Sequence, residues 1–437
     1  MTDSAASSTR SDSSPVSTSS RRSFVKSAAA LTGALTTVAA AAPHVHAAGS
    51  EDIKVGLVGC GGRGRGAIMD AVKASYHVKV TALADAFPEQ ITAVRETIKS
   101  QAKDQYAVTD DKCFVGLEAY KDLINEVDVV LLCSPPHFRP QHLEAAINAG
   151  KHVFCEKPVA TDPTGVRKVL EISELAAQKK LCLVSGLCWR YDHGVKETIK
   201  RIKDGAIGDI VSIQENYLTG TLWQKVRKEE WTDMEYQLRN WLYFRWLSGD
   251  HIVEQFIHSL DKSLWLHDDV PPKYAYGLGG RQVRTGPEFG DIYDHFSVVY
   301  EWEDGTRTYA HTRQMSGCVN EVEDFVFGTK GHAKVLANEI VSGDTKWKFE
   351  GDKPSMYQEE HRELFAAIRE GRVINNGKYM SYSTLMAIMG REACYSGQRI
   401  EWDKLMNSPM DLSPKSYDLK AAPPAVEVPQ PGKHKVI

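Results

Sequence analysis

The chain has 437 residues, of which 42 % are apolar and 25 % are charged. This length predicts two or three domains, and the composition excludes a disordered or low-complexity protein. The 53 Lys and Arg against 57 Asp and Glu give a net charge of −4, which disfavours nucleic acid or an anionic membrane as a partner.

The first 50 residues have the character of a targeting segment. Ser, Thr, Ala and Asp dominate at first, and Arg21-Arg22 then precede an uncharged, Ala- and Thr-rich run at 27–42. That run falls short of the roughly 20 strongly apolar residues that cross a bilayer. With the small-residue stretch at 45–47 it resembles a twin-arginine export signal. We therefore expect export to the periplasm without a stable membrane anchor; the alternative is a disordered tail with a chance arginine pair.

A glycine-rich turn follows the first strand-like run of the remaining chain. The run 52–58 ends in the pattern G-x-G-x-x-G, residues 65–74 continue with helical character, and a second strand-like run ends at Asp85. This order is the context of a dinucleotide fingerprint, in which the glycines admit the pyrophosphate to a helix N-terminus. The predicted cofactor-binding residues here are Gly59, Gly61, Gly62, Arg63, Gly64 and Asp85.

Asp85 favours NAD over NADP, because its carboxylate accepts hydrogen bonds from ribose hydroxyls and repels a 2′-phosphate. No Arg or Lys follows it directly, although Arg63 or another nearby base leaves NADP possible. The alternative to a nucleotide site is a glycine-rich turn without a ligand.

Helical and strand-like runs keep alternating up to residue 186, with further strands expected at 127–133, 152–155 and 181–185. This alternation predicts a doubly wound parallel sheet, a Rossmann domain over residues 51–186. Ligands bind beyond the carboxyl ends of such strands. The cofactor crevice is therefore expected to include Ser134, Pro135, His137 and Glu156.

Lys157 directly follows the strand at 152–155, in the triplet Glu156-Lys157-Pro158. A lysine at this rim, beside a carboxylate and near a cationic nicotinamide, can have its proton affinity tuned for acid–base work. The alternative is a solvated ion pair at the end of the strand.

From about Leu187 several strand-like runs follow one another, with an Asp-Gly turn at 304–305. They predict a C-terminal α/β domain over residues 187–400 with a large, mainly antiparallel open sheet. Residues 401–437 become rich in proline and are predicted to form an extended tail. The eight cysteines lack C-x-x-C spacing, so we expect mostly buried small residues and no zinc site.

Residues 249–266 are predicted to form one helix with a titratable face. His251, Glu254, His258 and Asp261 are spaced three, four and three residues apart. A carboxylate one turn before an imidazole orients and tunes it as a general acid or base, which points to Glu254 and His258. An exposed charged stripe is the alternative, and a metal site is disfavoured because no Cys or His cluster supports it.

Together these motifs resemble the Gfo/Idh/MocA oxidoreductase family, which includes glucose–fructose oxidoreductase and inositol dehydrogenases. The resemblance rests on the glycine turn, Asp85, the Glu156-Lys157-Pro158 triplet and the His258–Asp261 helix, and it extends from about residue 53 to 400. It implies NAD-dependent hydride transfer at a hydroxyl of a sugar or polyol. It also implies an open sheet that assembles the chain into a homo-oligomer, a dimer or a tetramer.

The resemblance further assigns roles within the site. Lys157 lies between nicotinamide and substrate, and His258 is the acid/base of a D-x-x-x-H helix in which Glu254 replaces the usual Asp. Our hypothesis is that His258 takes the hydroxyl proton, Glu254 orients it, and Lys157 stabilises the developing oxyanion. Arg190 is a candidate contact of cofactor or substrate, and the predicted substrate contacts are Tyr191, Arg239, Trp241, Tyr243, Arg245 and Asp261.

Export would constrain this chemistry, because an exported enzyme meets little free nicotinamide cofactor. We therefore expect NAD to be carried tightly bound. One alternative is an NAD-dependent glycoside hydrolase that oxidises its substrate transiently, although the Tyr and His motif of the resembling hydrolases is not found in the sequence. Another is a catalytically silent sugar-binding protein, which the retention of Lys157 and His258 disfavours.

Overall fold

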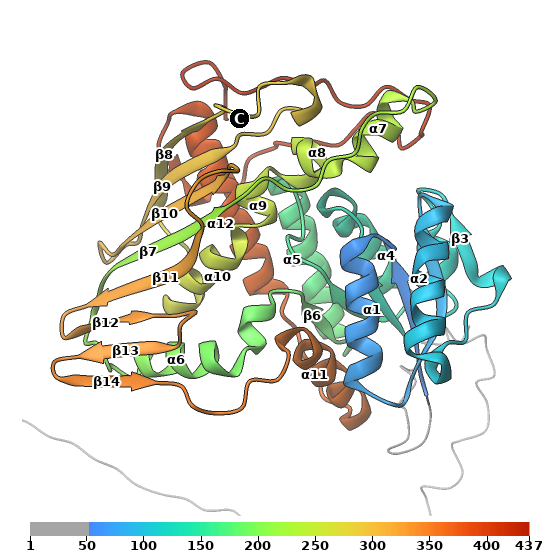
Figure 1. The fold of residues 1–437 in the computed structure, drawn as a ribbon, viewed down its shortest axis with the longest axis horizontal. Coiled ribbons are helices and arrows are strands. Elements are labelled where there is room, and N and C mark those ends of the chain that lie inside the picture. The colour runs from blue at the N-terminus through green and yellow to red at the C-terminus, as the bar shows by residue number, and fades with distance from the viewer. Residues whose placement is uncertain (1–51, 437) are drawn as a thin grey trace, which may run out of the picture. The chain divides into compact units, whose positions relative to one another are not determined.

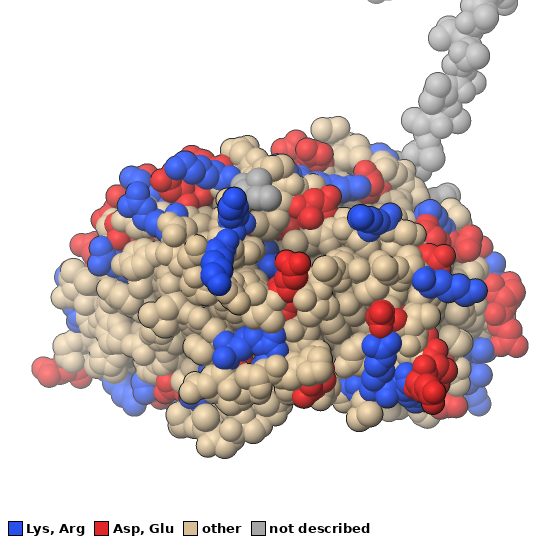
Figure 2. Space-filling view, turned by 90° about the horizontal axis from the view of Figure 1, so that it is seen from above, with Lys and Arg blue, Asp and Glu red and all other residues tan. Residues whose placement is uncertain are grey.

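Two β-sheets organise residues 52–436, which are the residues that the computed structural model describes (Figure 1). The predicted export signal at 1–50 lies outside these residues. Within residues 52–436, no helix combines the length and the apolar character needed to span a membrane. On the face shown in Figure 2, basic and acidic side chains are interspersed rather than gathered into a patch of one sign.

A six-stranded parallel sheet with the order β3-β2-β1-β4-β5-β6 forms the N-terminal part. Its strand order reverses between β1 and β4, which is where doubly wound sheets bind ligands. Strand β4 is buried along its whole length, as expected for a parallel strand covered on both faces. This sheet confirms the predicted Rossmann fold. Its strands are β1 (Ile53–Val58), β2 (Val78–Asp85), β3 (Cys113–Val115), β4 (Val129–Leu132), β5 (His152–Cys155) and β6 (Leu183–Ser185).

Helices cover both faces of this sheet. Those between its strands are α1 (Gly62–Ala74), α2 (Pro88–Gln101), α3 (Tyr120–Ile124), α4 (Arg139–Asn148) and α5 (Pro163–Gln178). Helix α5 begins with Asp162, whose side chain accepts a hydrogen bond from the Gly165 backbone N–H at 2.7 Å, and with Pro163 in its first turn. A helix from much later in the chain, α11 (Met356–Glu370), packs against α1 and shares its buried core.

A nine-stranded sheet with the order β14-β13-β12-β11-β7-β10-β9-β8-β15 forms the C-terminal part. Only its β7–β10 ladder is parallel, so the predicted large and mainly antiparallel sheet is confirmed. Its strands are β7 (Ile210–Thr219), β8 (Tyr274–Gly280), β9 (His295–Glu301), β10 (Arg307–Gln314), β11 (Glu321–Gly328), β12 (Gly331–Lys334), β13 (Glu339–Ser342), β14 (Thr345–Lys348) and β15 (Ile400–Glu401).

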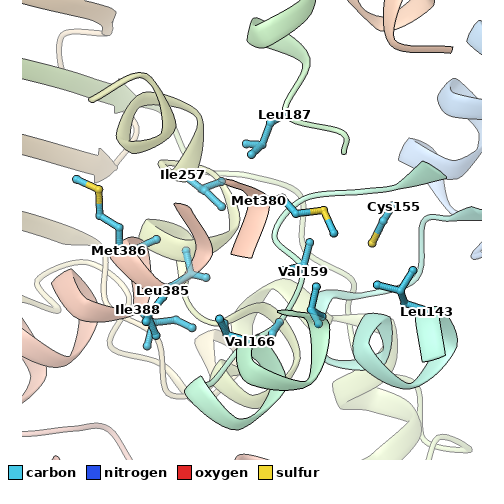
Figure 3. Packing of buried hydrophobic residues seen from close by; sticks show 14 of the residues in the cluster. Leu143, Cys155, Val159, Val166, Leu187, Ile257, Met380, Leu385, Met386 and Ile388 are labelled. Atoms are coloured by element: carbon cyan, nitrogen blue, oxygen red, sulfur yellow. The ribbon is translucent and has the colours of Figure 1, made fainter. Parts of the chain in front are cut away.

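Several helices of this second part pack between the two sheets. Besides α11, the helices of this part are α6 (His193–Lys203), α7 (Asp233–Arg239), α8 (Arg245–Ser248), α9 (His251–Glu254), α10 (Ile257–Leu266), α12 (Gly377–Ser396) and α13 (Trp402–Met406). Helix α12 packs against both α5 and α10. Figure 3 shows the resulting core, in which Leu143 and Val166 from the first part share a buried cluster with Ile257 and Leu385 from the second. This shared core fixes α10 relative to the Rossmann sheet.

The predicted single helix at 249–266 is two helices, α9 and α10. Gly249 and Asp250 both have a positive φ, so the first helix begins only at His251. The Asp250 carboxylate accepts hydrogen bonds from the backbone N–H groups of His251 and Tyr293, at 2.5 and 2.7 Å, which compensates this conformation. The helix then breaks at Gln255, and His251 is fully buried in contact with Phe296. The four titratable side chains therefore do not share one face.

The C-terminal segment is extended after α13, and it is held along its length by the rest of the fold (Figure 1). The Tyr417 hydroxyl hydrogen-bonds His137 Nε2 at 2.8 Å, and the Tyr293 hydroxyl donates to the Pro429 carbonyl at 2.7 Å. His434 Nε2 lies 2.8 Å from a carboxylate oxygen of Glu392. The segment thus runs as a strap from the Rossmann side to helix α12.

Candidate active site

The glycine turn between β1 and α1 has the shape of a dinucleotide cradle. Gly59 has a φ of +92°, and a Cβ on Gly64 would lie 1.8 Å from the Gly59 carbonyl oxygen. A Cβ on Gly61 or Gly62 would instead meet nothing within 4 Å, so the backbone there faces open space. Helix α1 begins at Gly62, and its first N–H groups suit a pyrophosphate. The residues present therefore fit NAD.

Replacing Gly64 with alanine is expected to lower the free energy of unfolding by about 1–3 kcal/mol, because the new methyl group overlaps a backbone oxygen that cannot move without opening the turn. Gly62→Ala is the matched variant: its methyl group enters open space, so NAD affinity should fall while stability stays near that of the wild type. Thermal unfolding and NAD titration of both variants measure these effects. Equal stability of the two variants would contradict this account of the turn.

Asp85 ends β2 and ties the glycine turn to the next loop. One carboxylate oxygen accepts the Cys60 backbone N–H at 2.7 Å, and the other accepts the Phe87 backbone N–H at 2.8 Å. Burial raises the pKa of this carboxyl, and the two hydrogen bonds oppose that shift. A carboxylate has about four lone-pair sites, so acceptor capacity remains for the ribose hydroxyls.

A cavity of about 560 Å³ extends from the glycine turn to the second part of the chain, within the size range of small-molecule sites. Seven predicted cofactor residues line it: Gly59, Gly61, Gly62, Arg63, Asp85, Ser134 and Pro135. Gly64 lies beneath the turn, and His137 is buried against Trp246 and Tyr417. Glu254 and Gln255 close the cavity at the second part of the chain.

Lys157, Glu254 and His258 are brought near one another from three different elements: Lys157 comes after β5, Glu254 ends α9, and His258 lies in α10. The Lys157 ammonium donates to the Glu254 backbone carbonyl at 2.6 Å and pairs with the Glu254 carboxylate at 3.1 Å. Both side chains are mostly buried. The charge of Lys157 acts on His258, whose Nδ1 atom is buried without a hydrogen-bond partner.

The environment of His258 keeps its imidazole neutral. Burial, and then the charges of Lys157 and Lys262, hold its pKa well below the ordinary value. The Lys262 ammonium donates to the His258 backbone carbonyl at 2.6 Å and pairs with Asp324 at 2.9 Å, so this cation is fixed in place. A neutral imidazole at neutral pH can accept a proton, which is what a general base requires.

Arg63 links the glycine turn to the strand end that carries Lys157, a role that the sequence did not reveal. Its guanidinium hydrogen-bonds Glu156 and lies 3.3 Å from carboxylate oxygens of Asp70 and of Glu360 on α11. Burial alone would raise the pKa of Glu156, but Arg63 and Lys157 outweigh it and the pKa is lowered. Arg63 is thus committed to carboxylates of its own chain, which leaves it poorly placed to accommodate a 2′-phosphate beside Asp85.

Arg63→Met is expected to lower the free energy of unfolding by about 2–3 kcal/mol at neutral pH, less than for a fully buried pair because the guanidinium is partly exposed. The lowered pKa of Glu156 means that its stabilisation is present above the ordinary Glu pKa of about 4.3 and is lost as the pH falls further. The deficit should therefore shrink in acid. Denaturant titrations across pH measure it, with the exposed Arg65→Met as control; equal effects of both variants would contradict the link.

The predicted substrate contacts divide into two groups. Arg239 and Trp241 line the cavity, close to Asp85 and Phe87. The others are not part of the cavity lining and are held by structural partners: Tyr191 donates to Asn376, Tyr243 donates to the carbonyls of Leu222 and Trp223, Arg245 contacts Asp291, and Asp261 accepts from Arg190 and Ser383. Arg190 also pairs with Asp269 at 2.6 Å. Aromatic and guanidinium groups, which are typical of sugar sites, serve buried hydrogen-bond networks equally well.

Metal-ligating side chains do not gather in the described part of the chain. Over residues 52–436, no three His, Cys, Asp or Glu side chains are grouped as a metal site. The cysteines of the chain all lie in this range and are free thiols, and five of them are buried.

Comparison with known proteins adds a family to this geometry. Residues 53–186 match the Gfo/Idh/MocA family model, described as an oxidoreductase family with an NAD-binding Rossmann fold. Inositol 2-dehydrogenase of Pseudomonas fluorescens is 26 % identical over 378 residues, which cover 82 % of this chain and 97 % of that protein.

Two further curated relatives align over shorter stretches. The chain is 26 % identical to 2,7-anhydro-N-acetylneuraminate hydratase of Escherichia coli over 50 % of its own length and 56 % of that protein. It is also 26 % identical to glycosyl hydrolase family 109 protein 2 of Shewanella sp. ANA-3 over 47 % of each chain. The chain therefore spans about half the length of these two relatives.

Among solved structures, scyllo-inositol dehydrogenase from Lactobacillus casei with bound NAD(H) and scyllo-inositol has the same fold. The TM-score is 0.61 at 19 % identity, and the match covers 81 % of this chain and all of the other. The two-sheet architecture thus recurs across nearly the whole described chain.

Proposed function

We propose that the chain is an NAD-dependent oxidoreductase that acts on a CH–OH group of a sugar or polyol. Its residues 53–186 match the NAD-binding Rossmann model of the Gfo/Idh/MocA family. The observation that carries this proposal is the Lys157–Glu254 pair: Glu254 lines the cavity that begins at the glycine turn, and the charge of Lys157 acts on His258. The inositol dehydrogenase that aligns over 97 % of its own length supports a polyhydroxylated substrate.

The proposed roles follow from the geometry of these three side chains. NAD, when bound, supplies the acceptor for the hydride that leaves the carbinol carbon with its electron pair. His258, held neutral by its surroundings, takes the hydroxyl proton as the carbonyl double bond forms. Lys157 donates to the substrate oxygen as negative charge develops on it. Glu254 positions Lys157 through its carboxylate and its backbone carbonyl.

We further propose that the chain is exported with NAD already bound, because an exported oxidoreductase meets little free cofactor. The arginine pair at 21–22 and the weakly apolar run after it support the export step. We also propose a homo-oligomer. Tyr276, Leu278, Tyr309 and Phe327 leave large apolar surface exposed on strands of the nine-stranded sheet, which supports pairing through this sheet.

A substrate panel tests the proposed function. Purified protein is denatured to release and identify any bound cofactor, and the intact protein is then mixed with sugars and polyols while the absorbance of reduced nicotinamide is followed. Reduction by a polyhydroxylated substrate, inositols included, is the expected result. If the protein neither contains nor binds a nicotinamide cofactor, the result would instead favour a catalytically silent sugar-binding protein.

A redox-assisted glycoside hydrolase is the second candidate, favoured by the alignments with the family 109 hydrolase and the hydratase. Such a reaction returns the hydride within each cycle, so bound NAD would show no net reduction. Release of an aglycone from a chromogenic glycoside without a lasting absorbance change would assign the chain to this class. Net reduction without aglycone release would exclude it for that substrate.

A further inference from the structure

A segment from the second part of the chain reaches over the cofactor side of the cavity. Residues 220–242, which we call the cover segment, leave β7 and return through α7. Seven of its residues line the same cavity as Asp85: Leu222, Trp223, Lys225, Leu238, Arg239, Trp241 and Leu242. An Asp at the end of the second Rossmann strand meets the adenosine ribose of a dinucleotide. The cover segment therefore lies at the adenosine half of the site.

Arg239 ties the cover segment to the Rossmann part. Its guanidinium pairs with Glu89 in the first turn of α2 at 2.5 Å and with Glu235 of its own helix at 2.8 Å. It also lies 3.7 Å from the centre of the Phe87 ring. The Arg239 side chain is only 12 % exposed, whereas its partner Glu89 is 52 % exposed. Arg239 thus joins the cover segment to Phe87, which lines the cavity, and to Glu89 beside it.

Lys225 is the free cation of the cover segment. Its backbone is fixed by Asn240, whose amide side chain accepts from the Lys225 N–H at 2.7 Å and donates to the Lys225 carbonyl at 3.0 Å. Lys225 lines the cavity, and within residues 52–436 no side chain forms an ion pair with its ammonium. Burial and the charge of Arg239 lower the pKa of Lys225, while Glu89 and Asp85 oppose that shift. An unpaired, half-buried cation at the cavity wall is suited to bind an anionic or oxygen-rich ligand.

Apolar side chains complete the adenosine end. The rings of Trp223 and Trp241 lie 6.1 Å apart between centroids, and Leu222 and Leu238 line the cavity beside them. Leu117 faces the same space from the Rossmann part. Such a lining suits the apolar faces of a purine. The hydroxyl groups of a sugar or polyol would instead lack hydrogen-bond partners there.

We infer that the cover segment is part of the dinucleotide site: Lys225 binds oxygens of the adenosine ribose–diphosphate, and the Arg239–Glu89 pair holds the segment closed over it. This inference deepens the proposed retention of NAD and rests on it. On this inference, residues outside the Rossmann domain retain the cofactor, because NAD can leave only after the Arg239–Glu89 pair opens.

The test compares Lys225→Met with Lys228→Met in the full-length protein stripped of cofactor. Lys228 lies in the same segment, is exposed, and pairs only distantly with Glu230, at 3.9 Å. Dissociation constants for NAD and ADP-ribose, and the NAD dissociation rate, are read from tryptophan fluorescence. Lys225→Met is expected to raise both constants at least about tenfold, as for one lost charge-assisted hydrogen bond. Lys228→Met should leave them unchanged.

Nicotinamide mononucleotide, which lacks the adenosine half, serves as the internal control: its affinity should be the same in the wild type and in Lys225→Met. A loss of affinity equal for this ligand and for ADP-ribose would overturn the placement of Lys225. So would a Lys225→Met variant that binds NAD as tightly as Lys228→Met. Repeating the titration with the 2′-phosphate analogue of ADP-ribose shows whether the Lys225 ammonium contacts the 2′ position of the adenosine ribose.

The tie is tested separately by Glu89→Gln, which removes the charge and keeps the shape, with Arg227→Ala as the control because Arg227 pairs with Asp233 within the segment. Glu89→Gln should speed NAD release several-fold, and an unchanged rate would refute the tie. If NAD exchanges rapidly from the wild type, the proposed retention fails, whereas the inference is still judged on the ratio between variant and control.

Discussion

His258→Ala is expected to lower kcat/KM for the oxidation of the substrate hydroxyl by about 10²–10⁴-fold, the range that a positioned general base contributes. The dissociation constant for NAD should stay near that of the wild type, because His258 does not line the cofactor cavity. Steady-state kinetics with the substrate found in the panel, together with NAD titration, separate the two effects. His332→Ala, on the exposed side of β12, is the control and should behave as the wild type.

The pH profile gives an independent test of the same residue. The pKa of His258 is lowered by burial and by neighbouring cations, so the neutral base persists as the pH falls below the ordinary histidine value of about 6.5. Wild-type kcat/KM should stay level through that region and fall only when His258 is finally protonated. A break at the ordinary histidine pKa, or a variant that retains wild-type turnover, would contradict the role of His258.

Lys157→Met is expected to lower kcat by about 10²–10³-fold, because it removes the donor that faces developing negative charge on the substrate oxygen. It also leaves the Glu254 carboxylate without the cation that pairs with it at 3.1 Å. The substrate KM should change much less than kcat if the interaction strengthens in the transition state. Pre-steady-state reduction of bound NAD measures the affected step directly.

Two companions make the lysine experiment decisive. Lys157→Arg keeps the positive charge and should recover part of the lost rate, whereas Lys168→Met, at a partly exposed pair with Glu144, should leave kcat unchanged. If Lys157→Met and His258→Ala both turn over at the wild-type rate, the active site lies elsewhere.

The sequence predicted the parts of the fold that local patterns encode. The strand, glycine turn, helix and Asp85 follow one another within about thirty residues, and each is fixed by short-range chemistry. The successive strands with an Asp-Gly turn likewise predicted the antiparallel sheet. The start of α9 at His251 was not predicted, because the conformation of Asp250 before it is supported by Tyr293 from another part of the chain.

For the candidate site, strand ends were the informative signal. The carboxyl ends of parallel strands meet at one edge, so Asp85, Ser134 and Lys157 could be placed near one another before the structure was known. The partner of Arg63 on α11 lies 297 residues away and leaves no local pattern. The same holds for Lys225, which carries no motif and is brought to the cavity only by the path of the cover segment.

Helix α11 has a consequence for how the molecule is made. Its Leu364 and Phe365 belong to the same buried cluster as Leu57 and Ile68 of the Rossmann part, and the β6 backbone at Leu183 hydrogen-bonds the Ile374 carbonyl at 2.8 Å. A nascent chain still on the ribosome lacks these residues after its first six strands have emerged. Because such long loop closures slow folding, we expect the Rossmann core to be completed only after α11 has been synthesised, well after the last of its six strands.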